Sequence, residues 1–124
     1  MKMRVYPKVW CKDIIYHKHH KIGYLQLVRY MTGDSTPHIE FKIEEPWQFQ
    51  GAMKKELPLY LKYLKKLGYQ QLIAVVKQDN AASKSLLEKN GFVAFKQMDE
   101  NIIYIIDMRL TKEIAKIVIQ DFFK

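Results

Sequence analysis

The turn between residues 48 and 53 combines residue types that suit the binding of a phosphate group. Its sequence, Gln48-Phe49-Gln50-Gly51-Ala52-Met53, stands between an alternating strand pattern and a helical pattern. The first turn of a helix offers unpaired N–H donors and the positive end of the helix dipole, and both favour an anion. Gly51 would let the backbone come close to a ligand. The alternative interpretation is an ordinary strand-to-helix turn.

A second stretch of interest begins at Asn80. It follows the apolar run from Leu72 to Val76, which is too short for a typical helix and predicts a buried strand. Asn80 is a good N-cap, so a helix is predicted from Ala81 to Asn90, and Gly91 suits the C-terminus of that helix. Phe92 to Phe95 then begins another strand.

The segment from His38 to Glu44 alternates strictly between polar and apolar residues, which predicts a strand with two different faces. One face is expected to be wet or to line a cleft, and a solvated surface is the simpler interpretation. The apolar face holds Ile39, Phe41 and Ile43, and the polar face holds His38, Glu40, Lys42 and Glu44.

Several further elements are expected to position these groups. Met1 to Tyr16 is rich in β-forming residues, and Pro7 within it predicts an edge strand or two short strands. Strands are also predicted at Ile22 to Tyr30 and at Ile102 to Met108, the latter joined to its predecessor by a hairpin turn at Asp99 to Asn101.

A helix is predicted to follow the turn at residues 48 to 53 and to end at Gly68. Pro58 is awkward inside it, so the regular helix should begin late or be kinked there. Its core-facing residues are predicted to be Leu57, Tyr60, Leu61, Leu64 and Leu67.

The C-terminal segment, Thr111 to Lys124, has the pattern of an amphipathic helix with Ile114, Val118 and Phe122 in one stripe. It should pack on the core or on a second subunit. We therefore expect one domain over residues 1–110 and a C-terminal helix over residues 111–124.

The charge balance limits the classes of partner. The 124 residues carry a formal net charge of +8, with 21 Lys and Arg against 13 Asp and Glu. Such a field attracts nucleic acid, an anionic membrane or a polyanionic small molecule such as coenzyme A. The lysines are scattered, and no RNP box or zinc knuckle is present, which argues against a dedicated polynucleotide groove.

Cysteine and histidine usage points to a cytoplasmic protein without a metal. Cys11 is the single cysteine, so no internal disulfide forms, which suits a reducing compartment. No apolar run approaches the ~20 residues of a membrane helix, and no signal peptide is evident. The segment from His17 to Lys21 holds three histidines, but its lysines would repel a cation, so a polar hairpin turn is predicted instead of a metal site.

Two motifs resemble those of the GNAT family, the GCN5-related N-acetyltransferases. The spacing N-x-x-S-x-x-L-x-x-x-x-G-F, from Asn80 and Ser83 to Phe92, is similar to the family's distal motif. Gln48 and Gly51 match the family's pyrophosphate loop, Q/R-x-x-G-x-G/A, although Met53 stands where glycine or alanine is usual. The resemblance covers Ile22 to Met108.

The resemblance implies an α/β (α+β) fold with a mixed, mostly antiparallel sheet and two splayed central parallel strands. It implies that acetyl-CoA is bound by the loop Gln48 to Met53, by the strand ending near Ile43, and by Asn80 and Ser83. An acceptor amine would attack the thioester directly, with the oxyanion held by a backbone amide.

Two departures from the family pattern bear on catalysis. Leu87 stands where many relatives carry a tyrosine acid, so Ser83 or water would serve as the acid. About twenty residues precede the strand at Ile22, so the helices that usually cover the acceptor site are expected to be missing, and that site is open, shared across a dimer, or lost. Glu40 is the candidate base, with His38 as the alternative.

The leading hypothesis is therefore an N-acetyltransferase that moves an acetyl group from acetyl-CoA to a primary amine of a small molecule or peptide. A catalytically silent GNAT-like module that binds acyl-CoA or a partner protein is the alternative. A small basic RNA-binding domain is a third hypothesis. A homodimer is compatible with each of them.

Overall fold

The computed structural model describes residues 8–29, 36–48, 51–110, 114 and 117. The chain forms two compact units, Met1–Leu61 and Lys62–Lys124. Within each unit the paired strands run antiparallel. The predicted fold class, a mixed α/β fold with a mostly antiparallel sheet, is confirmed.

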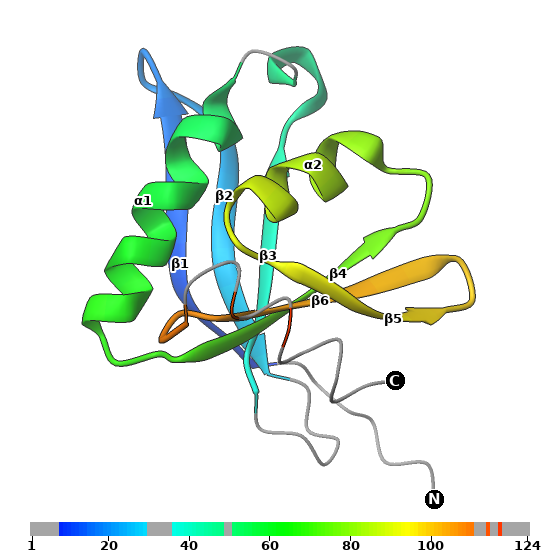
Figure 1. Cartoon of the computed structure of the whole chain (residues 1–124). Helices are drawn as coiled ribbons and strands as arrows, with labels where there is room; N and C mark the ends of the chain where they lie inside the picture. The colour runs from blue at the N-terminus through cyan, green and yellow to red at the C-terminus, as the bar shows by residue number, and fades with distance from the viewer. Residues whose placement is uncertain (1–7, 30–35, 49–50, 111–113, 115–116, 118–124) are drawn as a thin grey trace, which may run out of the picture. The chain divides into compact units, whose positions relative to one another are not determined.

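The first unit contains three antiparallel strands, β1 (Lys8–His17), β2 (His20–Arg29) and β3 (His38–Ile43), as Figure 1 shows. Strand β1 begins at Lys8 and is an edge strand, which was one of the two predicted alternatives. The hairpin between β1 and β2 turns at Lys18 and His19, whose φ angles are 47° and 71°. The predicted polar hairpin turn is thus confirmed.

Strand β2 is buried on both faces. Leu25 and Leu27 are fully buried on one face, and Ile22 and Val28 are buried on the other. Gly23 permits a close approach of β3, because a Cβ at this position would overlap the Lys42 carbonyl oxygen and lie 2.9 Å from Ile43 Cδ1. Glycine is therefore required where β2 meets the end of β3.

Helix α1 (Ala52–Lys66) contacts β1, because the Tyr60 hydroxyl donates a hydrogen bond to the Cys11 carbonyl oxygen at 2.6 Å. The helix begins at Ala52 and contains Pro58, so the late start is wrong, and the kink at Pro58 stays a prediction. Four of the predicted core positions are buried, namely Leu57, Tyr60, Leu61 and Leu64.

The C-terminus of α1 is closed by Gly68 with φ +100°. The Tyr69 N–H donates to the Leu64 carbonyl oxygen at 3.1 Å, which is the pattern of a Schellman cap. Leu67 lies in this cap and is 52% exposed, so its predicted place in the core is wrong. The cap turns the chain away before Leu67 can complete the buried stripe.

The second unit contains β4 (Gln71–Lys77), α2 (Ala81–Lys89), β5 (Val93–Met98) and β6 (Asn101–Asp107). Strand β6 pairs antiparallel with both β4 and β5. The hairpin between β5 and β6 turns at Asp99 and Glu100, as predicted.

The first unit also contains the three-residue 3₁₀ helix η1 (Glu45–Trp47).

One face of the second unit's strands packs beneath α2. A Cβ at Gly91 would lie 3.6 Å from Ile106 Cδ1, so the end of α2 reaches β6. Burial raises the pKa of the Tyr104 phenol, and the negative charge of Glu88 raises this pKa further. The prediction that the whole run from Leu72 to Val76 is buried is only partly right, because Val75 on the other face is 45% exposed. The buried residues of the α2 face are Leu72, Ala74, Leu87, Phe92, Tyr104 and Ile106.

The predicted C-terminal helix falls almost entirely outside the described residues. Ile114 and Ile117 are helical and exposed, whereas Val118 and Phe122 lie in the part that is not described. Among the described helices, none is long and apolar enough to cross a membrane.

Candidate functional site

Strand β3 ends in a polar turn that carries the first of the predicted cofactor contacts. The Glu44 N–H donates to the Ile22 carbonyl oxygen at 2.7 Å, which extends the pairing of β2 and β3 by one residue. The Gln48 side chain then folds back, and its Nε2 donates to the Ile43 carbonyl oxygen at 2.9 Å. At the end of the strand that the resemblance assigns to acetyl-CoA, the Ile43 carbonyl oxygen is thus held by Gln48 in this structure.

Gly51 and Ala52 form the start of α1. Gly51 has φ +80°, and among the described residues no heavy atom beyond those of its two chain neighbours lies within 4 Å of the position where a Cβ would stand. Its carbonyl oxygen accepts from the Lys55 N–H at 3.2 Å, so the helical hydrogen bonding begins at this residue. The first turn contains no acidic residue, and Lys54 and Lys55 are exposed there. This helix start therefore presents positive charge next to a glycine with open space beside it.

Met53 departs from the family's usual glycine or alanine. Its side chain is buried, at 8% exposure, so it belongs to the core of the first unit. The bulk at this position is therefore directed into the protein and away from solvent. Phe49 and Gln50, the remaining predicted contacts of this loop, lie outside the described residues.

Glu40 lies on the polar face of β3, as the alternation predicted. It stands opposite Gln26 of β2, whose Nε2 donates to Glu40 Oε1 at 3.1 Å. Glu40 and His38 are half-buried, whereas Lys42 on the same face is exposed. The sequence interpretation missed Gln26, although it is the one side-chain amide within the run I-G-Y-L-Q-L-V-R-Y.

Asn80 caps α2 as predicted. Its Oδ1 accepts from the Ser83 N–H at 3.1 Å. The cap uses the oxygen of the exposed side-chain amide, so the Nδ2 donor is not required for it. Ser83, the candidate acid, lies in the first turn of α2 and is half-buried.

Leu87 lies one turn after Ser83 and is fully buried. It contributes to the core of the second unit, with Phe92 directly after the helix. The position at which many relatives carry a tyrosine therefore supplies packing here and no proton.

The structure brings the predicted residues together in two local groups. In the first unit Gln48 contacts Ile43, close in sequence to Gly51, and Glu40 contacts Gln26. In the second unit Asn80 and Ser83 contact each other.

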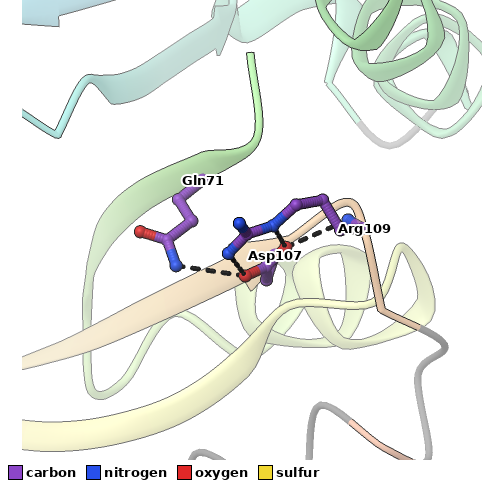
Figure 2. Close-up of polar contacts among 3 residues, drawn as sticks. All are labelled: Gln71, Asp107 and Arg109. Atoms are coloured by element: carbon purple, nitrogen blue, oxygen red, sulfur yellow. Dashed lines mark hydrogen bonds and ion pairs between the residues drawn. The ribbon is translucent and has the colours of Figure 1, made fainter. Parts of the chain in front are cut away.

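A strong polar cluster at the end of β6 was not anticipated. The Asp107 carboxylate accepts from Arg109 Nε at 2.9 Å, from an Arg109 terminal nitrogen at 2.6 Å, and from Gln71 Nε2 at 3.1 Å. Figure 2 shows the two side chains converging on this carboxylate. These contacts, the Arg109 hydrogen bonds above all, hold the pKa of Asp107 well below its usual value. The D-x-R spacing at the end of β6, from Asp107 to Arg109, was the available sequence signal.

Metal-ligating side chains are not clustered in the part of the chain that the structure describes. There, no group of three or more His, Cys, Asp or Glu residues is arranged to hold a metal ion.

Comparison with solved structures shows the same fold in several acetyltransferases. PaiA N-acetyltransferase from Thermoplasma acidophilum, in complex with coenzyme A, matches with a TM-score of 0.65 and 17% identity over 80% of this chain and 60% of that chain. An IAA acetyltransferase from Bacillus cereus matches with a TM-score of 0.66 and 18% identity over 78% and 77% of the two chains. An acetyl transferase from Salmonella typhimurium that modifies the N-terminal serine of ribosomal protein L7/L12 matches with a TM-score of 0.64 and 18% identity over 83% and 64%.

These likenesses concern the fold, and this chain spans less than two thirds of the length of the first and third of these proteins. Among curated proteins, none has significant sequence similarity to it. The family model described as the Acetyltransferase (GNAT) domain matches residues 6–93, well over half of the chain. The chain therefore belongs to the GNAT family of acetyltransferases.

Proposed function

We propose that this protein is an N-acetyltransferase that transfers an acetyl group from acetyl-CoA to a primary amine. The observation that carries the proposal is the start of α1: Gly51 with a positive φ and open space beside it, followed by a first turn without acidic residues, in a GNAT-family chain. A structural neighbour with 17% identity is a complex with coenzyme A, which supports acetyl-CoA as the co-substrate.

In this proposal the pyrophosphate binds at Gln48 to Met53, where helix N–H donors and the exposed Lys54 and Lys55 favour an anion. Gln48 leaves the Ile43 carbonyl oxygen so that a pantetheine N–H can donate to it in its place. Asn80 and Ser83 contribute through the Asn80 Nδ2 donor and the Ser83 hydroxyl, which the helix cap does not use.

The reaction is a direct transfer. The amine nitrogen attacks the thioester carbonyl carbon, a C–N bond forms, and the C–S bond breaks. Glu40 takes a proton from the amine, and Ser83 or a water molecule gives a proton to the departing thiolate. The products are an acetamide and coenzyme A with a free thiol. The proton that Glu40 takes from the ammonium form of the amine passes to solvent, and the second proton, lost from the nitrogen as the amide forms, replaces the one that Ser83 or water gave to the thiolate.

The first test measures acetyl-CoA binding by isothermal titration calorimetry. Gly51→Trp should weaken binding because its side chain fills the space beside the turn. Gly51→Asn is the matched control, since asparagine tolerates a positive φ and adds little bulk. Wild-type affinity in a folded Gly51→Trp variant would remove this turn from the binding site.

The alternative is a catalytically silent module that binds acyl-CoA, and the buried Leu87 at the usual tyrosine position favours it. Release of free thiol in the presence of an amine separates the two functions. Binding of acetyl-CoA without thiol release across an acceptor panel would support the silent module.

The acceptor is proposed to be an amine of a small molecule or a peptide. A neighbour of the same fold modifies the N-terminal serine of a ribosomal protein, so peptides with free N-termini belong in the panel beside polyamines and amino sugars. Mass spectrometry of the product would identify the acetylated nitrogen.

We further propose that the protein acts in the cytoplasm, on the ground that its single cysteine, Cys11, suits a reducing compartment. A homodimer is proposed from a half-exposed apolar stripe along α1 and its cap, formed by Leu59, Tyr63 and Leu67. Residues 1–110 are the proposed acyl-CoA-binding domain, and residues 111–124 are proposed as a helix that packs on it or on a partner. Cell fractionation and light scattering test location and assembly.

A further inference from the structure

Gln26 is a polar side chain in a place where apolar side chains would otherwise pack. It lies in the middle of β2, between the fully buried Leu25 and Leu27, and is itself only 9% exposed. Burying an amide without hydrogen bonds costs free energy, so such a residue is expected to have a specific partner.

That partner is a carboxylate on the next strand. Gln26 and Glu40 are directly opposite in the antiparallel pairing of β2 and β3, and Gln26 Nε2 donates to Glu40 Oε1 at 3.1 Å. The terminal torsion of a glutamate is otherwise broad. A hydrogen bond from a buried, packed amide therefore restricts the orientation of the Glu40 carboxylate, while Glu40 itself remains half-buried.

The pair could serve only to fix the register of β2 and β3. Two features of the strands weaken that explanation. Ile39 and Phe41 stand opposite Leu27 and Leu25 of β2, and this pairing already specifies the register, since a slip by one residue would exchange the two faces of β3. Gly23, whose missing Cβ leaves room for the Lys42 carbonyl oxygen, specifies it again. An additional buried amide is not needed for that purpose.

We propose that Gln26 is a positioning residue that fixes the carboxylate of Glu40 for removal of the proton from the acceptor amine. This inference rests on the proposed acetyl transfer and on Glu40 as its base. Gln26 would act through Glu40 alone, because proton transfer needs the base held within hydrogen-bond reach of the amine in the correct orientation.

The test uses the full chain with acetyl-CoA and an amine that the wild type acetylates, with free thiol as the readout. Gln26→Met keeps the length of the side chain and removes the donor. Leu27→Met is the matched control, because it changes the neighbouring buried residue on the opposite face of β2. Each variant is also made in the Glu40→Gln background, and acetyl-CoA affinity is measured by calorimetry.

We expect Gln26→Met to lower kcat by roughly tenfold or more, as for the loss of a hydrogen bond to a charged group. The affinity for acetyl-CoA and the activity of Leu27→Met should stay within about twofold of the wild type. In the Glu40→Gln background, Gln26→Met should have little further effect, because residues that act through one group are not additive.

Three outcomes would overturn the inference. The first is a kcat for Gln26→Met equal to that of Leu27→Met. The second is a loss of kcat on Gln26→Met that is equally large in the wild-type and the Glu40→Gln backgrounds. The third is a wild type that binds acetyl-CoA but acetylates no amine, and this result, seen with the unsubstituted chain, marks the failure of the proposed function itself. If Gln26→Met does not fold, Gln26→Asn takes its place, since its amide is one methylene shorter and draws back from Glu40.

Discussion

Replacing Arg109 with methionine should destabilise the second unit through a single carboxylate. Asp107 stands opposite Gln71 in the pairing of β4 and β6 and is 7% exposed. Arg109 supplies two side-chain hydrogen bonds and its backbone N–H to that carboxylate. Arg109→Met keeps the backbone donor and an apolar side chain, and it removes the guanidinium (Figure 2).

The expected loss lies between two limits. Exposed ion pairs contribute about 0–1 kcal/mol, whereas removing one partner of a fully buried pair costs about 3–5 kcal/mol. The side chains here are 8% exposed for Asp107 and 54% exposed for Arg109, and Gln71 remains as a donor. We therefore expect a loss of about 2 kcal/mol in the free energy of unfolding at pH 7.

Urea unfolding followed by circular dichroism measures this loss. With a slope of about 1.5 kcal/mol per molar urea, the midpoint should fall by about 1.3 M. Arg109→Lys is the control that keeps the positive charge and loses the bidentate contact with Asp107. Its urea midpoint should therefore lie between those of the wild type and Arg109→Met.

The same pair predicts a pH dependence with a definite sign. The pKa of Asp107 is lowered in the folded state from an ordinary value of 3.8, first of all by the Arg109 hydrogen bonds. The unfolded chain therefore binds the proton more readily, and the stabilisation is complete above about pH 5 and is lost as the pH falls below the unfolded pKa. The difference between wild type and Arg109→Met should narrow between about pH 5 and pH 2.

Two results would refute this reasoning. A loss below about 0.5 kcal/mol at pH 7 would mean that the half-exposed guanidinium contributes no more than a surface pair. A difference that stays constant on acidification would mean that the loss arises from packing of the arginine stem and not from the carboxylate.

Three further predictions concern single positions. Asn80→Ala should lose about 1 kcal/mol of stability and weaken acetyl-CoA binding. Asn80→Ser should keep the helix cap and lose only affinity for acetyl-CoA. Equal affinity in the wild type and both variants would leave Asn80 with a structural role alone. Gly23→Ala should lower the free energy of unfolding by about 2 kcal/mol or more, measured by thermal unfolding, because its Cβ meets the Lys42 carbonyl oxygen. Gly68→Ala, which has open space but a φ of +100°, should lower it less. A larger loss for Gly68→Ala than for Gly23→Ala would contradict the strand contact. Tyr63→Glu should halve the mass seen by light scattering if α1 forms a dimer interface, and an unchanged mass would exclude this stripe.

Local chemistry along the sequence determined much of this protein by itself. Asn80 and Gly91 bracket a helix because an amide oxygen caps its first N–H groups and a glycine accepts the positive φ of 94° at its end. The alternation from His38 to Ile43 determined which side chains share a face of β3. Family motifs of the same local kind indicated the GNAT fold.

The two ends of α1 depend on competing local preferences. Pro58 argued for a late or kinked helix, yet α1 begins at Ala52, because its buried stripe from Met53 to Leu64 is continuous and packing outweighs one lost hydrogen bond. Leu67 fits the helical period, but the cap at Gly68 leaves it exposed.

Only the tertiary structure decided the contacts between residues far apart in the sequence. Gln26 and Glu40, and likewise Gln71 and Asp107, are joined by strand pairing, and no local preference states which residue will stand opposite which. The sequence showed that Leu87 stands where many relatives carry a tyrosine. Its complete burial follows from the packing of α2 against β6. Sequence patterns report the preferences of neighbouring residues, whereas register and burial arise when separate strands and helices pack together.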